Sequence, residues 1–215
     1  MQVEEFSLQG RRDTNLDVIK QIHHENFSIF LVIDGFNNQE EKLARQQIDD
    51  FVEELFTSIN PSMNYAEFIN KFREINKFFN GSISFLWLEK NKCYVAFCGD
   101  CRVYLNGALK TTDHTQAWKM CSRRVSDLNL IGELCITNPY QNVLLKSMKN
   151  DECEITNFDL QSGDQILIIT DGGWQQLHHK IVKRIFNASE LCEEIFSDNA
   201  SGYCIKIDSV HDKNR

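Results

Sequence analysis

The chain has 215 residues, of which 42% are hydrophobic, so it can bury a full core as one large domain. Its net charge of −8 argues against nucleic-acid binding, which depends on attraction to phosphates, and no apolar run approaches the roughly 18 residues of a membrane span. The eight cysteines, together with an N-terminus that lacks the form of a signal peptide, predict reduced thiols in a cytosolic protein.

Little of the sequence resembles linker material, because it contains only 2 prolines and 10 glycines. We therefore expect a single domain over residues 1–208 and a polar C-terminal tail over 209–215, which we expect to be frayed.

Strands are predicted in the first 35 residues. Residues 18–22 alternate imperfectly, residues 23–26 form a plausible turn, and the apolar run 28–33 reads as a strand buried on both faces. This run ends at Asp34-Gly35. A carboxylate at the end of a buried strand is costly unless it is paired or binds a cation, and the glycine lets the backbone turn tightly beside it.

Two amphipathic helices follow, because apolar residues recur at spacings of three and four from residue 39 to 59 and again from 64 to 80. Asn60-Pro61 ends the first helix, and Asn64 with Glu67 has the form of a capping box that opens the second. The aromatic residues on both helices are predicted to be core.

The middle of the chain returns to strands, which we expect at residues 83–88, 93–97 and 103–105. Asn106-Gly107 is a strong hairpin turn signal. Residues 110–137 have no clean period and are predicted to form a loop with a short helix.

A second apolar run, residues 165–170, also ends in an Asp-Gly pair, Asp171-Gly172. Helices are expected at 174–186 and 189–196, with a closing strand at 203–207. Because strict strand–helix alternation is missing, the pattern favours two mainly antiparallel sheets with helices packed outside. Two strands that each end in an Asp could bring both carboxylates to one rim, which is the outline of a divalent-cation site.

Six short motifs resemble, in order, those of the metal-dependent serine/threonine protein phosphatases of the protein phosphatase 2C type. Each one is weak alone, and their shared order along nearly the whole chain carries the resemblance. They are Arg12-x-x-Asn15-x-Asp17, Asp34-Gly35, Gly99-Asp100-Cys101-Arg102 with Asp113-His114, Asn138-Pro139 to Lys146, Gly163-Asp164 to Trp174, and Asp198-Asn199-Ala200-Ser201.

The resemblance implies an α+β fold, a four-layer α-β-β-α sandwich of two mainly antiparallel sheets flanked by helices. It also implies two Mg²⁺ or Mn²⁺ ions in a cleft at one end. The implied metal ligands are Asp34, the Gly35 carbonyl, Asp171 and Asp198. Oxygen ligands suit Mg²⁺ or Mn²⁺ better than Zn²⁺.

The remaining implied roles concern the substrate and the surroundings of the ions. Arg12 would hold the substrate phosphate and act in catalysis with Asp34. Asp17 and Asp100 would support the ligands from behind or help to hold a third, weaker metal ion, and Asn199 would also support the ligands from behind. The implied activity is hydrolysis of phosphoserine or phosphothreonine in a phosphoprotein by a metal-bridged hydroxide, without a phosphoenzyme.

Several positions depart from the family pattern. Leu16 stands where relatives carry Glu or Gln, and Phe36 stands where animal relatives have His and bacterial relatives usually Met. Gln175 replaces an Asp that would help to hold a third ion. The glycines after the second motif are replaced by Asn37-Asn38, and the segment between His114 and Asn138 is short. These changes leave room for a second interpretation, a catalytically weak or inactive binding module on the same fold.

A thiol or zinc site at Cys98 and Cys101 is a third and weaker interpretation, because no second cysteine pair stands nearby. His23-His24 and His178-His179 are expected to be surface residues rather than ligands, and the basic run 180–184 to be a solvated helix face.

Overall fold

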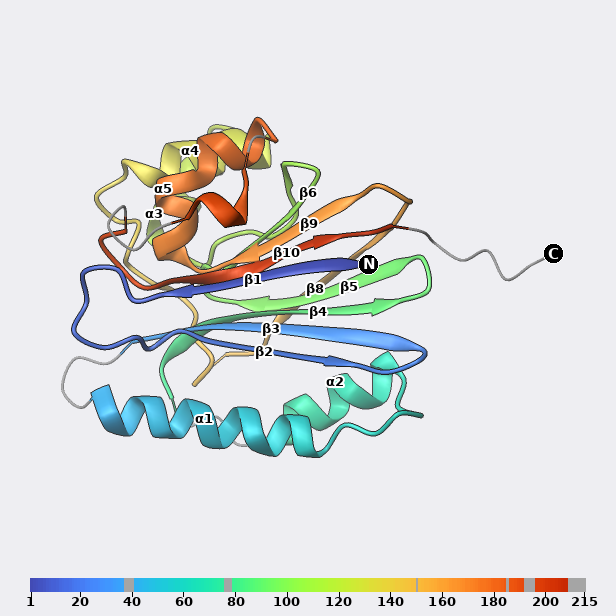
Figure 1. The fold of residues 1–215 in the computed structure, drawn as a ribbon. Coiled ribbons are helices and arrows are strands. Elements are labelled where there is room, and N and C mark those ends of the chain that lie inside the picture. Colours follow the sequence, from blue (N-terminus) through green and yellow to red (C-terminus); the bar gives the residue numbers. More distant parts are fainter. Residues whose placement is uncertain (37–40, 76–78, 150, 185, 192–195, 209–215) are drawn as a thin grey trace.

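A computed structural model of the chain describes residues 1–36, 41–75, 79–149, 151–184, 186–191 and 196–208. Two five-stranded sheets pack face to face, and helices cover both outer faces, so the fold is an α-β-β-α sandwich (Figure 1). The predicted α+β class and layer order are confirmed. None of the helices in these described ranges has the length and apolar character needed to cross a membrane.

Every strand pair in the two sheets is antiparallel. The first sheet has the order β1 (Gln2–Leu8), β10 (Ala200–Lys206), β9 (Gln165–Ile169), β6 (Arg102–Leu105) and β7 (Ala108–Leu109). The second has the order β2 (Val18–His23), β3 (Phe27–Gly35), β4 (Gly81–Glu89), β5 (Lys92–Cys98) and β8 (Glu154–Asp159).

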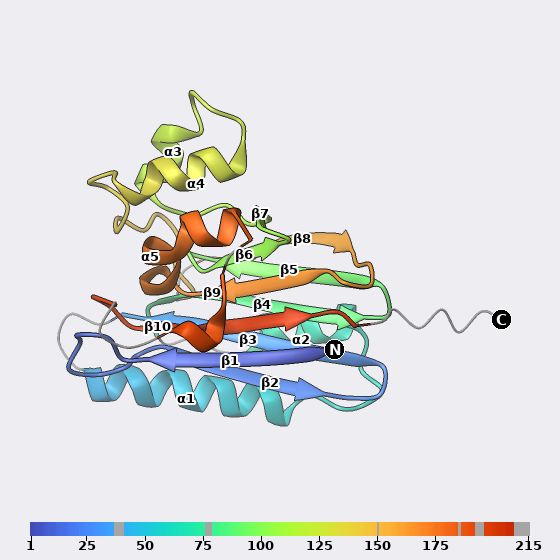
Figure 2. The same ribbon diagram turned by 45° about the horizontal axis from the view of Figure 1, so that its top comes forward.

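The helices divide between the two outer faces. Helices α1 (Glu41–Thr57) and α2 (Tyr65–Glu74) cover the second sheet, while α3 (Gln116–Cys121), α4 (Leu128–Ile136) and α5 (Asp171–Val182) lie over the first. Figure 2 shows α3 and α4 beyond α5, on the opposite side of the molecule from α1 and α2. A short 3₁₀ helix, η1, spans Ala188–Glu190.

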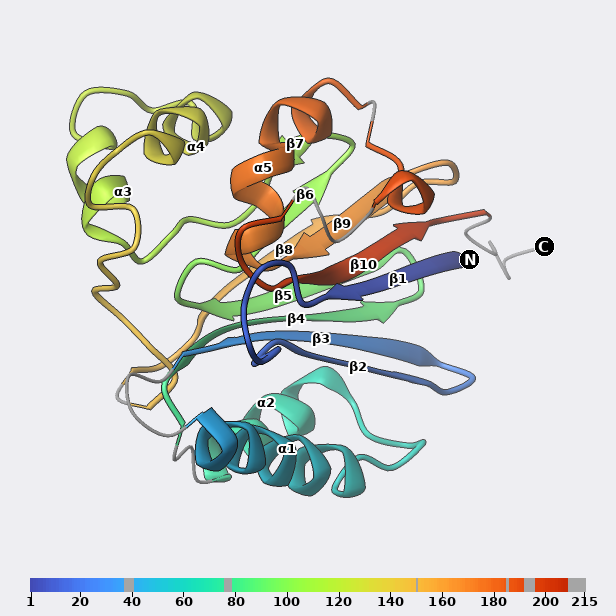
Figure 3. The same ribbon diagram turned by 60° about the vertical axis from the view of Figure 1, so that its left-hand side comes forward.

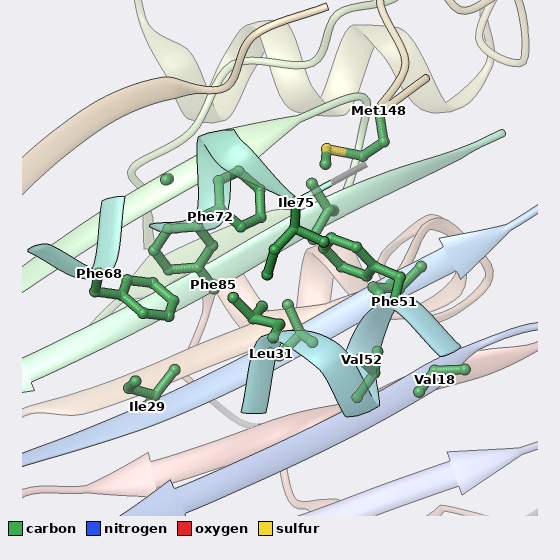
Figure 4. Close-up of a cluster of buried hydrophobic side chains, with 14 of the residues drawn as sticks. Val18, Ile29, Leu31, Phe51, Val52, Phe68, Phe72, Ile75, Phe85 and Met148 are labelled. Carbon is green, nitrogen blue, oxygen red and sulfur yellow. The ribbon is translucent and has the colours of Figure 1, made fainter. Parts of the chain in front are cut away.

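Three hydrophobic clusters fill the spaces between the four layers. One lies between the sheets, and its members include Phe30, Val95 and Ile168. Another joins α3, α4 and α5 to the first sheet. The third packs the aromatic faces of α1 and α2 onto β3 and β4, with Phe51, Phe68 and Phe72 among its members (Figure 4). Burying these aromatic side chains provides much of the driving force for folding.

Most predicted elements are confirmed near their predicted bounds. The run 29–33 is fully buried as β3, and the capping box of Asn64 and Glu67 opens α2, with both backbone N–H groups satisfied at 3.0 Å. Most apolar positions predicted as helical core are buried, and these are Ala44, Ile48, Phe51, Val52, Leu55, Ile59, Phe68, Ile69 and Phe72, while Phe56 is half-buried against the same cluster. Ile75 and Phe79 are buried as well, but they follow α2, which ends at Glu74 instead of near residue 80.

Several predicted bounds need correction. Residues 110–137 hold two helices, α3 and α4, rather than one, and each is capped by a side chain: Thr115 accepts from Trp118 N and Asp127 from Leu130 N. Helix α5 begins at Asp171 instead of 174 and ends at Val182 instead of 186. The closing strand begins at Ala200 rather than 203, and β8 was not predicted.

Some predictions fall on residues outside the described ranges. These are Asn37-Asn38, the first residues of the helix predicted from residue 39, residues 76–78 of the second predicted helix, residues 192–195 of the helix predicted at 189–196, and the polar tail 209–215. The domain boundary at residue 208 stays a prediction.

Candidate metal and phosphate site

One end of the sandwich gathers the acidic residues that the sequence singled out. The C-terminal ends of β1, β3 and β9 lie together there, with the start of α5 and the β1–β2 loop (Figures 1 and 3). A cleft of about 270 Å³ opens at this end. Its lining includes every predicted ligand and the predicted phosphate-binding residue, together with two of the predicted supporting residues: Arg12, Asp34, Gly35, Asp100, Asp171, Asp198 and Asn199.

Two glycines allow the acidic segments to approach one another. Gly99 has φ +95°, and a Cβ there would lie 2.1 Å from Ser82 Oγ, the hydroxyl that donates to Asp100 Oδ1 at 2.6 Å. A Cβ on Gly172 would lie 2.1 Å from the Asn199 carbonyl oxygen. These glycines are therefore needed for backbone approach, and they set where Asp100, Asp171 and Asn199 stand.

Asp17 lies beneath the cleft rather than in its lining, and its side chain is 3% exposed. Thr170 Oγ1 donates to Asp17 Oδ2 at 2.8 Å, but Oδ1 is buried without a hydrogen-bond partner among the described residues. Burial raises the pKa of Asp17 to about 8, and the negative charge of Asp171 adds to this effect. An unpartnered carboxylate oxygen in such a place is suited to a cation or to water bound by one.

Asn199, which directly precedes β10, holds the β1–β2 loop that carries Arg12 and Asp17. Its amide Nδ2 donates to Gln9 O at 2.9 Å and to Thr14 O at 3.2 Å, while its Oδ1 accepts from Leu16 N at 3.0 Å. Because these three bonds reach across more than 180 residues of sequence, Asn199 fixes the position of the β1–β2 loop.

Arg12 pairs with Asp198 at the rim of the cleft. Its Nε donates to Asp198 Oδ1 at 2.7 Å, and its Nη2 donates to Oδ2. The hydrogen bond to Asp198 raises the pKa of Arg12, and the negative charges of Asp198, Asp171 and Asp34 act in the same direction. The arginine side chain is still 59% exposed.

Asp34, Asp100 and Asp171 carry more negative charge than their surroundings balance. Removal from water raises the pKa of Asp34 well above its usual range, and the charges of Asp171 and Asp17 raise it further. Burial likewise raises the pKa of Asp100 well above its usual range, and that of Asp171, whose hydrogen bond with Asp34 partly offsets the effect. Arg12 is the only lysine or arginine among the described residues that line the cleft.

Three of the departures from the family pattern lie at the cleft. Leu16 is buried in its wall, and Phe36 is 39% exposed at its edge. Gln175 Nε2 donates to Asp171 Oδ2 at 3.1 Å, so an amide stands where a further carboxylate would repel Asp171.

These residues fit a divalent cation in donor type and charge. All the candidate donors are oxygens, the carboxylates raise one another's pKa, and Asp17 Oδ1 has no partner in the described structure. Within the described ranges, however, no three or more His, Cys, Asp or Glu side chains already surround a single point, and Asp198 is bonded to Arg12. The roles of the individual residues therefore stay predictions.

The thiol interpretation has little support. Burial raises the pKa of Cys98 to about 12 and that of Cys101 well above its usual range, so neither is set up as a thiolate. The expectation that His178 is a surface residue is wrong, because it is 3% exposed and its Nδ1 lies 2.9 Å from Tyr104 OH.

Solved structures share this architecture over almost the whole chain. The serine/threonine phosphatase of S. agalactiae has a TM-score of 0.74 and 16% identity, and the match covers 96% of this chain and 99% of that one. The serine/threonine phosphatase of Staphylococcus aureus gives 0.74 and 17%, with 96% and 95% covered. The chain has the fold of the protein phosphatase 2C family.

A third solved structure is the catalytic domain of the serine/threonine phosphatase PstP in complex with two manganese ions. It matches this chain with a TM-score of 0.63 and 14% identity, and the match covers 94% of this chain and 96% of that one. No protein-family profile matches the sequence, and no curated protein matches it either.

The structure adds cleft residues that sequence reasoning did not assign to the site. Ser82 and Thr170 hold the carboxylates of Asp100 and Asp17, and Asn142 and Leu144 line the cleft. Thr170, Asn142 and Leu144 belong to motifs noted in the sequence, whereas no local signal marks Ser82.

Proposed function

We propose that this protein is a metal-dependent phosphatase that hydrolyses phosphoserine or phosphothreonine in proteins. The observation that carries the proposal is the grouping of Asp34, Asp171 and Asp198 with Arg12 in one cleft of a protein phosphatase 2C fold. The fold brings these side chains together from four separate parts of the chain, which a purely structural role would not require.

Two Mg²⁺ or Mn²⁺ ions would be held by Asp34, the Gly35 carbonyl, Asp171 and Asp198. Such ions lower the pKa of water and neutralise negative charge on a phosphoryl group. Asp17 and Asp100 support the ligands from beneath, held by Thr170 and Ser82, and Gln175 offers no charge to a third ion.

Arg12 binds the phosphate in this proposal. Nε and one N–H of Nη2 are used by Asp198, which leaves Nη1 and the second N–H of Nη2 free to donate to phosphate oxygens. Asn199 keeps Arg12 within reach of the cleft by fixing its loop.

The test is hydrolysis of a phosphothreonine peptide, followed as phosphate release, with Mn²⁺ added and then chelated by EDTA. We expect turnover that depends on Mn²⁺ and falls at least about 100-fold in Asp34→Asn, since removing a residue that binds the metals and stabilises charge costs about that much. The exposed Asp13→Asn variant on the neighbouring loop is the matched control. Equal activity in wild type and Asp34→Asn would refute the proposal.

A catalytically weak or inactive binding module is the second candidate. Leu16 in place of an oxygen ligand, Gln175 in place of a carboxylate, and the hydrogen bonds between Asp198 and Arg12 favour it. In that case the wild-type protein binds phosphopeptides without releasing phosphate at any Mn²⁺ concentration.

A further inference from the structure

The cleft has an apolar edge that the proposed chemistry does not use. Phe36, which follows β3, and Leu144, from the segment after α4, both line the cleft that holds Arg12 and the carboxylates. Phe36 is 39% exposed and Leu144 is half-buried, so each presents apolar surface that a bound molecule could cover.

Leu144 is held in place by its backbone. Its segment forms an antiparallel bridge between Thr115 and Leu144, with hydrogen bonds from Gln116 N to Val143 O at 2.9 Å and from Leu145 N to His114 O at 2.7 Å. In this extended geometry alternate side chains point to opposite sides. Leu144 accordingly lines the cleft. Val143 and Leu145 do not line it, and each is 46% exposed.

Phe36 is fixed in a similar way, because its backbone N donates to Asn80 O at 3.2 Å. Both side chains therefore stand on backbone that is already positioned, and covering them costs little conformational entropy.

The charges around the cleft also restrict what can lie beside the phosphate. Acidic side chains dominate the lining, and Arg12 is its only lysine or arginine among the described residues. An acidic residue next to the phosphate would find no second lysine or arginine in the described lining to pair with. Once divalent ions balance the carboxylates, a basic neighbour would gain little.

We infer that Phe36 and Leu144 form a subsite for a bulky apolar side chain directly next to the phosphorylated residue. This rests on the proposed function, since it assumes that a phosphorylated protein segment enters the cleft. The substrate class is then a phosphoserine or phosphothreonine flanked by leucine-like residues, rather than by acidic or basic ones.

The test uses phosphopeptides that differ only in the residues flanking the phosphorylated position: leucine, alanine, aspartate or lysine. Binding is measured by fluorescence anisotropy, with Mn²⁺ present, on peptides in which a CH₂-phosphonate replaces the phosphoester so that turnover cannot interfere. kcat and KM are measured on the matching phosphothreonine peptides, and 4-nitrophenyl phosphate serves as a substrate without flanks.

We expect the leucine peptide to bind about fivefold more tightly than the alanine peptide, because half-burying one leucine side chain gains about that much. The difference from the aspartate and lysine peptides should be larger. Phe36→Ala and Leu144→Ala should each reduce this preference, whereas Phe36→Met should keep most of it. Val143→Ala, on the same segment but outside the cleft lining, is the matched control and should bind like wild type. Circular dichroism checks that each variant is folded.

Equal binding of all four peptides, or a preference for aspartate or lysine, would overturn the inference. So would a leucine preference that survives in both alanine variants. If no peptide and no 4-nitrophenyl phosphate is hydrolysed while the leucine phosphonate still binds best, the proposed activity fails and the subsite stands.

Discussion

Two groups of buried charged side chains in this molecule differ in whether their charges are paired. Arg102 and Asp113, 0% and 1% exposed at their side chains, make two hydrogen bonds of 3.0 and 2.6 Å, and the guanidinium lies 3.4 Å from the centre of the Trp174 ring. Among the described residues that line the cleft, Arg12 is the only lysine or arginine beside the carboxylates, and it forms hydrogen bonds with Asp198 alone among them. The first group is complete in itself, while the second has an excess of negative charge.

The comparison shows how a buried charge that stabilises the fold differs from one that serves a binding site. A charge placed for stability has its partner within the chain, whereas clustered charges without partners destabilise the fold unless something binds them. Trp174 connects the two groups, because its Nε1 donates to Asp100 O at 2.8 Å while its ring covers Arg102.

The largest expected effect comes from breaking the complete pair. Arg102→Met leaves Asp113 buried without a cation, and we expect it to lower the free energy of unfolding by about 3–5 kcal/mol, measured by urea denaturation. The double variant Arg102→Met, Asp113→Leu removes the unpaired charge and should recover much of that loss. Equal stability of the single and double variants would contradict a complete pair.

Removing a charge from the cleft should have the opposite sign. Asp17→Asn keeps an acceptor for Thr170 but removes a buried carboxylate, so in EDTA we expect the free energy of unfolding to rise by about 1–3 kcal/mol. Urea denaturation beside the exposed Asp13→Asn control measures this. A loss of stability in Asp17→Asn would show that the carboxylate is a structural partner like Asp113.

The dependence of stability on pH should report the same excess of charge. Because burial raises the pKa of Asp17 to about 8, the folded chain holds protons that the unfolded chain releases near pH 4. In EDTA the free energy of unfolding should therefore fall as pH rises from about 4 to about 8, and saturating Mn²⁺ should remove this fall. A stability that rises over that range in EDTA would contradict the account.

The smallest effect is expected at Gln175, whose Nε2 now donates to Asp171. Gln175→Asp replaces this donor with a like charge and should lower the free energy of unfolding in EDTA by about 1 kcal/mol, while tightening Mn²⁺ binding. Gln175→Ala loses the bond without adding charge and should bind Mn²⁺ like wild type. Calorimetry with both variants separates the two effects.

The sequence predicted the elements whose pattern is local and strong. The apolar runs before Asp34 and Asp171 became β3 and β9, and the spaced aromatics became the buried faces of α1 and α2. Strand β8 escaped prediction because it is an edge strand with polar, largely exposed residues. Helices α3 and α4 are short and depend on the caps of Thr115 and Asp127 more than on periodicity.

The sequence allowed us to predict which acidic residues gather at the cleft, but not which hydrogen bonds they form there. That Asp34 and Asp171 would meet follows from two buried strands ending in Asp-Gly. The bonding of Arg12 to Asp198 and the bridging by Asn199 span more than 180 residues, so only the packing of the two sheets determines them. The missing partner of Asp17 Oδ1 is likewise a property of three-dimensional packing.

Calorimetric titration of the EDTA-stripped protein with Mn²⁺ tests most directly whether the excess of charge at the cleft is a binding site. We predict saturable Mn²⁺ binding to the wild type that is lost in Asp34→Asn and in Asp171→Asn, while Asp13→Asn binds as the wild type does. No heat of binding to the wild type, or the same binding in all four proteins, would contradict the account.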